Sequence, residues 1–191
     1  RSRYLLVENR KVENYVDMAL YYARMDAVYK DYMIAETNLQ EVAQQVLLQN
    51  KYYLIQSHVK AEVACPDTVY SDKKWIAFIL NQLIQNSVKY GRSEGTHIQI
   101  VTKKTKSGVL LRVKDDGIGI PKEELPRIFE KGFTGTNGRN RERSTGMGLY
   151  LCRKLCDKLN IEIRAESAEG KGTEIILMFP VSDYLTGYRE T

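Results

Sequence analysis

Residues 72–90 read DKKWIAFILNQLIQNSVKY, and this stretch decides which fold the chain is expected to adopt. Asp72 is a favourable N-cap residue, and the apolar residues after it recur at helical spacing. They form one stripe, made of Trp75, Ile76, Ile79, Leu80, Leu83 and Ile84. The stretch therefore predicts a long helix with one buried face that ends near Tyr90.

Polar side chains interrupt the apolar face of this helix. Asn86 falls inside the stripe, and Gln82 and Lys89 lie at its edge. A buried amide needs hydrogen-bond partners or a ligand. Asn86 is therefore either a core residue satisfied by the backbone or an oxygen ligand for a hard cation such as Mg²⁺. Lys89, one turn further on, could meet a phosphate.

A glycine-rich turn follows a predicted strand over residues 115–120, which read DDGIGI. Glycines allow positive φ and let a flat ligand approach the backbone closely. An ionised Asp115 can only accept hydrogen bonds, so it could accept one from an exocyclic amine. An ordinary Asp-Gly turn explains the same residues.

Two further glycine motifs lie downstream. Residues 144–149, STGMGL, lead into a helix, and free N–H groups at a helix N-terminus favour an anion. A flexible lead into a helix is the simpler explanation. Residues 170–173, GKGT, separate the last two predicted strands, and a hairpin turn accounts for them.

The remaining elements follow outward from these motifs. The sequence predicts helices over 4–30, 39–50 and 146–159, a short helix after Pro121, and strands over 31–36, 54–64, 97–105, 108–115, 161–167 and 173–180. Residues 130–146 are expected to form a mobile loop. This order predicts an α+β domain in which helices cover one face of a mixed sheet.

Composition limits the classes of function. The 191 residues are 43% hydrophobic and 28% charged, which suits one globular domain with a helical extension. The net charge of +5 is scattered, and its densest cluster, at 139–143, is interrupted by Glu142. That cluster is a solvated or phosphate-facing loop, and no nucleic-acid partner is expected. The three cysteines have no metal-type spacing and are expected to be buried reduced thiols.

Five motifs in order give the chain a family resemblance. Asn86, the Asp115 turn, Phe129 with Phe133, the glycines at 146 and 148, and the 172–173 turn resemble the N, G1, F, G2 and G3 boxes of the histidine kinase ATP-binding domain. The resemblance covers about residues 31–181. Residues 81–90 look most like the small kinases that sense antimicrobial peptides in Gram-positive bacteria.

The resemblance implies a Bergerat-type (GHKL) α/β sandwich that binds ATP and Mg²⁺. Asn86 would hold the Mg²⁺, Asp115 would accept from the adenine amino group, and Thr173 would support Asp115. Phe129 and Phe133 would anchor a lid. The other nucleotide-binding residues implied are Gln82, Lys89, Tyr90, Gly117, Gly119, Ile120, Lys131, Thr145, Gly146, Met147, Gly148 and Leu149.

Gln82 is a departure from the family pattern. Many histidine kinases have Asn at this position, so a weaker or indirect Mg²⁺ contact is expected. The hydrolysing ATPases of the fold, and its Ser/Thr kinase and anti-sigma branch, carry a Glu base there. An amide cannot accept a proton at neutral pH, so the chain is expected to bind ATP without hydrolysing it well. Ser144 stands where the glycine-rich box often begins with Gly.

The implied function is transfer of the ATP γ-phosphoryl group to a histidine, for relay to a response-regulator aspartate. The helix within residues 1–30 resembles the second helix of a dimerisation bundle, residues 31–181 form the catalytic domain, and 182–191 form a tail. His58 and His97 are both expected to be structural, so the acceptor histidine is expected outside this chain.

The parent protein is expected to be a homodimer anchored in the cell membrane, with this chain as a cytoplasmic domain. The chain begins at Arg1 rather than Met and contains no apolar run as long as a membrane span. It is therefore expected to be a piece of a longer protein. The alternative function is a degenerate GHKL domain that binds partners without kinase activity.

Overall fold

The computed structural model describes residues 12, 16, 19, 33–136 and 146–181 of the chain. Residues 12, 16 and 19 are helical, and the rest of the expected 4–30 helix lies outside the described residues. So does the tail from residue 182, and the expected loop over 130–146 is described only at its two ends. In the described part of the chain, no helix combines the length and hydropathy needed to cross a membrane.

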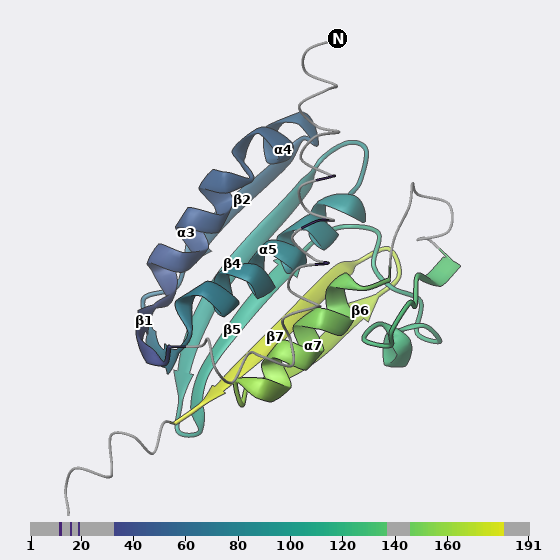
Figure 1. Cartoon of the computed structure of the whole chain (residues 1–191). Coiled ribbons are helices and arrows are strands. Elements are labelled where there is room, and N and C mark those ends of the chain that lie inside the picture. The colour runs from purple at the N-terminus through teal and green to yellow at the C-terminus, as the bar shows by residue number, and fades with distance from the viewer. Residues whose placement is uncertain (1–11, 13–15, 17–18, 20–32, 137–145, 182–191) are drawn as a thin grey trace, which may run out of the picture.

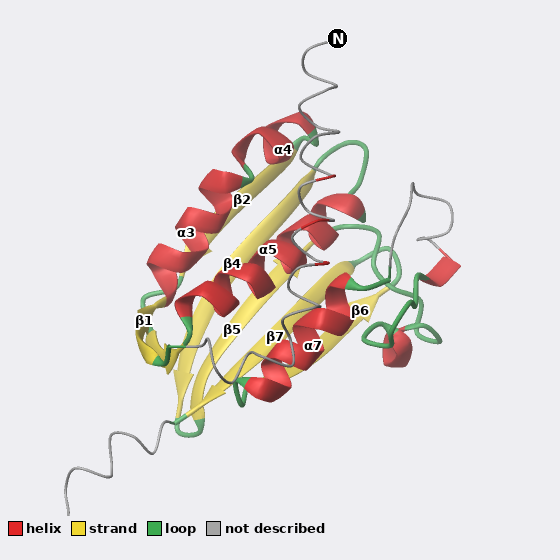
Figure 2. Cartoon of the chain, in the orientation of Figure 1, coloured by secondary structure: helices red, strands yellow, loops and turns green. Residues whose placement is uncertain are grey.

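A five-stranded mixed sheet forms one layer of the domain, and helices lie on one of its faces (Figures 1 and 2). The strand order is β2-β4-β5-β7-β6, in which only β2 and β4 are parallel. The strands are β2 (Val59–Ala64), β4 (Thr96–Thr105), β5 (Gly108–Asp115), β6 (Glu162–Ala168) and β7 (Gly172–Pro180). The predicted fold class is therefore confirmed.

The helix predicted from residues 72–90 is the centre of the helical layer. It is α5 (Lys73–Lys89), and it lies between α3 (Leu39–Gln49) and α7 (Gly148–Lys158) (Figure 1). Every residue of its predicted apolar stripe is at most 2% exposed. Against it pack the inward side chains of the central strands, among them Ile98, Ile100 and Leu111, which are fully buried. Removal of this apolar surface from water is the main driving force for the fold.

Side chains along each strand point alternately to the buried face of the sheet, under the helices, and to the opposite, more exposed face. On β5, Leu111, Val113 and Asp115 are buried beneath the helices, whereas Lys114 is exposed on the opposite face. The three cysteines, Cys65, Cys152 and Cys156, are buried and free, as expected. Burial raises the pKa of Cys65 to about 11 and that of Cys156 to about 12, so both thiols stay protonated at neutral pH.

The strand predicted over 54–64 is wrong at its start. Residues 51–56 form α4 (Lys51–Gln56), and only Val59–Ala64 are strand. Asn50 explains the extra helix, because its side-chain amide donates to the carbonyl of Val46 and to Oδ1 of Asn81, at 2.8 Å each. These bonds satisfy the polar groups at the junction with α3, and Leu54 of α4 enters the core. His58, placed in a strand by the prediction, lies in the turn before β2 with φ 54°.

A small second sheet was not predicted. It pairs β1 (Ala35–Asn38) with β3 (Thr68–Ser71) in antiparallel register. Four residues are too few to show a clear period, so β3 gave no strand signal and the predicted strand at 31–36 was placed too early. After Pro121 there is a turn and a 3-10 helix, η2 (Leu125–Arg127), and α7 begins two residues later than predicted.

The side chain of Asp72 hydrogen-bonds both to the start of α5 and to the segment before β1. Its Oδ1 accepts from the backbone N–H groups of Lys74 at 2.9 Å and Trp75 at 3.3 Å, which caps the helix. Its Oδ2 accepts from the backbone N–H of Met33 at 2.6 Å. The side chain is buried, so both oxygens work in a partly desolvated position.

We predict that Asp72→Ala lowers the free energy of unfolding by about 1–2 kcal/mol, because a buried cap and a second hydrogen bond are lost together. Asn38→Ala at the exposed cap of α3 removes one bond, to the N–H of Glu41, and should cost less. Urea denaturation of both variants and of Asp72→Asn, which keeps one amide oxygen, measures the difference. An Asp72→Ala protein as stable as the parent would contradict this role.

Candidate nucleotide-binding site

Asp115, the last residue of β5, is the centre of a buried hydrogen-bond cluster. Its Oδ1 accepts from the backbone N–H of Gly117 at 3.0 Å and that of Thr173 at 3.2 Å. Its Oδ2 accepts from the hydroxyl of Ser87 on α5 at 2.8 Å. A carboxylate offers about four acceptor positions. Oδ2 therefore keeps one acceptor position that no described residue fills.

The protonation of Asp115 reflects two opposing effects. Burial raises its pKa above the ordinary value, since desolvation penalises the charged form. The hydrogen bonds from Ser87, Gly117 and Thr173 act in the other direction because they favour the ionised carboxylate. The three donors thus hold an acceptor-only group in a site where water cannot stabilise it.

Two glycines let the backbone close around this carboxylate. Gly172 has φ +102°, and a Cβ there would lie 2.0 Å from the carbonyl oxygen of Asp115. A Cβ at Gly117 would lie 2.5 Å from the carbonyl oxygen of Tyr90 and 3.0 Å from Oδ1 of Asp115. Both positions therefore require glycine, for a reason of close packing that the sequence motif alone did not show.

Three of the predicted site residues, Gln82, Asn86 and Lys89, lie on the C-terminal half of α5, and Tyr90 is its C-cap. The burial of the two amides differs from the prediction. Gln82, placed at the edge of the stripe, is buried at 7% exposure, whereas Asn86, placed inside it, is only half-buried. No described residue hydrogen-bonds either side-chain amide. Lys89 and Tyr90 are half-buried, and burial lowers the pKa of Lys89. The explanation that Asn86 is satisfied within the core is therefore wrong.

The N-terminus of α7 faces Gln82. A Cβ at Gly148 would lie 2.9 Å from Oε1 of Gln82, so the start of α7 and the Gln82 side chain are in close proximity. No side chain caps the helix at Met147, and its first N–H groups point out of the helix end. Gly146, Met147 and Leu149 are half-buried around this end, and Thr145 lies outside the described residues.

The predicted lid anchors lie between the Asp115 turn and α7. Phe129 and Phe133 pack against the core, with Arg153 of α7 5.4 Å from the Phe129 ring centre and Arg127 4.7 Å from that of Phe133. Lys131 is exposed. The backbone N–H of Gly132 donates to the carbonyl of Gly146 at 3.0 Å. This bond joins the two described ends of the segment that the sequence predicts as a lid.

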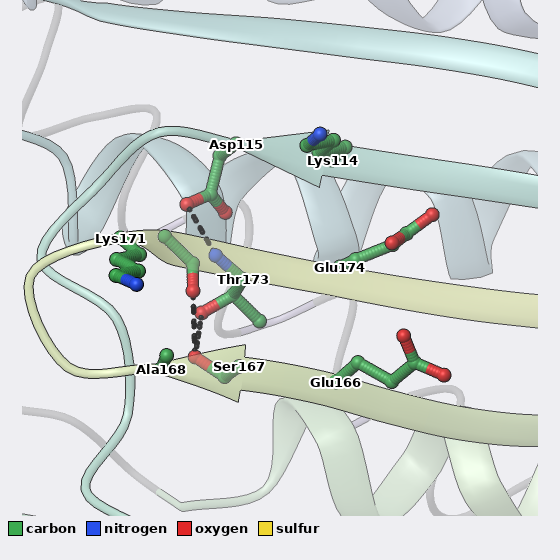
Figure 3. Close-up of a pocket in the computed structure, with 9 residues that line it drawn as sticks. Lys114, Asp115, Glu166, Ser167, Ala168, Lys171, Thr173 and Glu174 are labelled. Atoms are coloured by element: carbon green, nitrogen blue, oxygen red, sulfur yellow. Dashed lines mark hydrogen bonds between the residues drawn. The ribbon is translucent and has the colours of Figure 1, made fainter.

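A hollow of about 300 Å³ lies beside Asp115, at the ends of β5, β6 and β7 (Figure 3). The charged side chains that line it include Lys114, Glu166 and Glu174, which belong to the sheet face opposite the helices. The Asp115 carboxylate instead points to Ser87 on α5, on the helical side. Asp115, Ser167 and Thr173 also line the hollow, so it reaches the edge of the cluster around Asp115.

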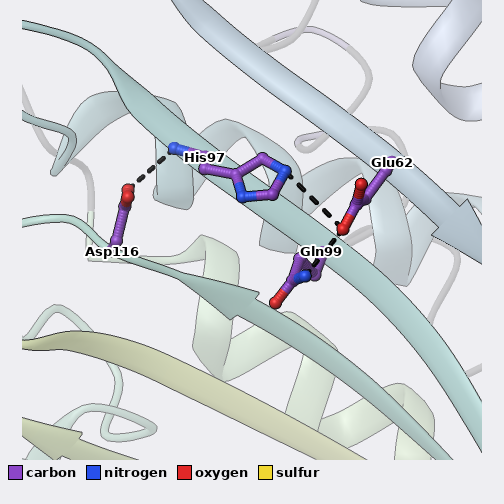
Figure 4. Close-up of polar contacts among 4 residues, drawn as sticks. All are labelled: Glu62, His97, Gln99 and Asp116. Carbon is purple, nitrogen blue, oxygen red and sulfur yellow. Dashed lines mark hydrogen bonds and ion pairs between the residues drawn. The ribbon is translucent and has the colours of Figure 1, made fainter.

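Neither histidine hydrogen-bonds to the Asp115 carboxylate. His97 is on the sheet face opposite the helices, where Nε2 lies 3.7 Å from Oε1 of Glu62, and Gln99 donates to the same oxygen at 2.6 Å (Figure 4). The backbone N–H of His97 donates to Oδ1 of Asp116 at 2.7 Å. The carbonyl of His58 accepts from the N–H of Thr96 at 3.3 Å. Both residues thus help to hold the start of β4, in line with the structural role expected of them.

Two residues of the cluster were missed from sequence. Ser87 follows Asn86 directly and faces the sheet, where it donates to Asp115. The only sequence signal for this contact is the position of Ser87 on the buried side of the predicted helix. Ser167 of β6 accepts from the N–H of Ile120 at 2.9 Å and lies 2.9 Å from the hydroxyl of Thr173 (Figure 3). Thr173 therefore supports Asp115 through its backbone, while its side chain bonds to Ser167.

Comparison with known proteins agrees with this geometry. Residues 71–183 match the family model described as histidine kinase-, DNA gyrase B-, and HSP90-like ATPase. The sensor histidine kinase YxdK of Bacillus subtilis is 34% identical over 90% of this chain and 54% of its own length. The sensor protein kinase GraS of Staphylococcus aureus is 36% identical over 96% of this chain and 53% of its own. The chain thus spans about half the length of these relatives.

Solved structures give the same result. The catalytic domain of the histidine kinase ThkA, in a nucleotide-free form, aligns with a TM-score of 0.66 and 26% identity, over 78% of this chain and 97% of that one. The histidine kinase AdeS of Acinetobacter baumannii aligns with a TM-score of 0.72 over 93% of this chain, at 19% identity, which shows the fold alone. The chain therefore belongs to the histidine kinase-, DNA gyrase B-, and HSP90-like ATPase family and carries a catalytic domain of the histidine kinase type.

Proposed function

We propose that this domain binds ATP with Mg²⁺ and transfers the γ-phosphoryl group to a histidine of a two-component sensor kinase. The observation that carries the proposal is the open acceptor position on Oδ2 of buried Asp115. An exocyclic amine is a donor that fits such a position, and adenine supplies one. A Cβ at Gly117 would lie 2.5 Å from the carbonyl oxygen of Tyr90, and one at Gly119 would lie 2.1 Å from that of Ala168, so these glycines let the turn beside Asp115 pack closely against its neighbours.

The phosphate end of the nucleotide would lie between α5 and α7. The uncapped N-terminus of α7 at Gly148 offers N–H groups and a favourable dipole for an anion. Lys89 supplies a nearby cation on α5, and exposed Lys131 supplies another on the F-box segment. Phosphoryl transfer requires mainly positioning and neutralisation of charge, which such an arrangement can provide.

The amides on α5 fit a Mg²⁺ ion. Asn86 and Gln82 present carbonyl oxygens, the ligand type that Mg²⁺ prefers, and neither amide is hydrogen-bonded by a described residue. Asn86, the more exposed of the two, would hold the ion, and Gln82 would act at longer range or through water. Mg²⁺ held by Asn86 would neutralise part of the negative charge of the phosphate groups. Because Gln82 is not a base, the site favours transfer over hydrolysis.

The partners follow from the relatives. The histidine kinase ThkA has been solved in complex with the response regulator protein TrrA, which supports a response regulator as the final phosphate acceptor here. The acceptor histidine is proposed to lie outside this chain, because the backbones of His58 and His97 make hydrogen bonds that hold the start of β4, in keeping with a structural role for both residues. Dimerisation through a helical bundle and a membrane anchor are proposed for the whole protein by the same family likeness.

The most direct test is calorimetric titration with a non-hydrolysable ATP analogue, with and without Mg²⁺, beside Asp115→Asn. The Asn side chain can still accept from Gly117 and Thr173, but its NH₂ group would face the purine amine. We predict binding weakened by about 10- to 100-fold, as for loss of a charge-assisted hydrogen bond. The melting temperature should not fall, since the variant removes a buried charge. Equal affinity would contradict the proposed base contact.

The pH dependence of base binding tests the role of Ser87. Loss of its hydroxyl in Ser87→Ala removes a donor that favours the ionised form, so the already raised pKa of Asp115 should rise further. The ionised carboxylate is the stronger acceptor, so adenosine affinity falls as pH drops through that pKa. We predict that the fall begins at higher pH in Ser87→Ala and returns towards the parent value in Ser87→Thr. Identical pH profiles for all three proteins would rule this out.

Labelling with γ-³²P ATP tests the location of the acceptor. We predict that the chain binds the nucleotide but incorporates no label that is stable to base and labile to acid, the behaviour of a phosphohistidine. A His58→Gln, His97→Gln double variant is the matched control and should behave identically. Label on the parent chain that the double variant loses would place the acceptor within this chain and contradict the proposal.

A further inference from the structure

Three turns from distant parts of the sequence meet at one end of the sheet. The exit of α5 covers residues 90–95, the turn after β5 covers 116–120, and the β6–β7 turn covers 169–171. Each adjoins a different part of the Asp115 cluster. Tyr90 ends the helix that carries Ser87, Gly117 donates to Oδ1, and the third turn leads into Thr173.

Hydrogen bonds join these turns in a closed ring. The N–H of Ile118 donates to the carbonyl of Tyr90 at 3.0 Å, and the N–H of Gly170 donates to the carbonyl of Ile118 at 2.7 Å. The guanidinium of Arg92 then donates through Nη2 to the carbonyl of Gly170. Arg92 is joined to Tyr90 by two peptide bonds, so its side chain completes the ring.

Arg92 makes a second bond that reaches the residue beside Asp115. Its Nε donates to the carbonyl of Asp116 at 2.8 Å. The Arg92 side chain therefore links the exit of α5 to both of the other turns. The guanidinium is a rigid fork with several donors in one plane, which suits two carbonyls presented together. A lysine has no such fixed pair of donors.

The backbone around Arg92 and Asp116 is itself held in place. The N–H of Arg92 donates to the hydroxyl of Thr96 at 2.7 Å, and a Cβ at Gly91 would lie 2.6 Å from that hydroxyl. The side chain of Asp116 accepts from the N–H of His97 (Figure 4). Residues at the start of β4 therefore hold the backbone of Arg92 and the side chain of Asp116, and so position the Arg92 guanidinium.

We infer that Arg92 is a positioning residue for the base-binding end of the nucleotide site. It acts through the Asp116 and Gly170 carbonyls and sets the relative position of the donors that hold the Asp115 carboxylate. The inference rests on the proposed function, because the site that it positions is the proposed adenine pocket. The Arg92 side chain bonds only to backbone carbonyls among the described residues, so its effect on the nucleotide is indirect.

The location of Arg92 makes a specific prediction about which ligands are affected. Its bonds lie at the Asp115 end of the site, whereas α7 and Lys131 serve the proposed phosphate end. Loss of the fork should therefore weaken adenosine, ADP and an ATP analogue by the same factor, about 5- to 30-fold for two lost hydrogen bonds. Damage at the phosphate end would instead weaken the ATP analogue most and adenosine least.

Calorimetry with these three ligands tests the inference in Arg92→Ala and Arg92→Lys. The matched control is Arg164→Ala, which removes an exposed arginine on β6 that lies 3.6 Å from Glu162. We expect equal weakening of all three ligands in Arg92→Ala at a stoichiometry near one, partial recovery in Arg92→Lys, and no change in the control. If Arg92→Ala does not fold, the same comparison of Arg92→Lys with the parent decides the question.

Two results would overturn the inference. A lower stoichiometry at unchanged Kd would show that Arg92 only stabilises the fold, and unchanged Kd at full stoichiometry would show that the ring is dispensable. In both cases the parent protein still binds all three ligands, so the proposed function survives. Absence of binding by the parent protein would instead remove the proposed function and this inference with it.

Discussion

The bond between the Ser87 hydroxyl and the Asp115 carboxylate is the contact on which the site depends, because it joins the central helix to the central strand at their functional ends. The apolar contacts between α5 and the sheet determine that these elements pack together. They do not determine which polar groups meet at the end of the interface. The Asp115 carboxylate determines which polar groups meet there, because a buried charge is tolerated only where hydrogen-bond donors surround it.

This constraint carries a cost in stability. Burial raises the pKa of Asp115, so its ionised form is less favourable in the folded chain than in the unfolded one. A core optimised only for stability would place a neutral group there. Retention of a charged acceptor with one open position is therefore best explained by a ligand, in keeping with the general link between function and strained or desolvated groups.

The sequence predicted those parts of the structure whose signals are long or local. The apolar stripe of α5 extends over several turns. The glycine-rich motif after Asp115 predicted the end of β5. The helix α4 was missed because its support is a side-chain bridge from Asn50 to Asn81, a contact between residues far apart in the sequence. Ser87 and Arg92 were missed for the same reason, since their partners lie on other elements and leave no periodic pattern.

In the proposed site, Asp115 accepts a hydrogen bond from the exocyclic amine of adenine. Competition between ATP and inosine triphosphate for the domain tests it most directly, since the two nucleotides differ at that position by an oxygen in place of the amine. The carbonyl oxygen of inosine would lie against Oδ2 of Asp115, and two hydrogen-bond acceptors repel each other. We predict that inosine triphosphate binds at least about 10-fold more weakly. Equal affinity for the two nucleotides would contradict the account.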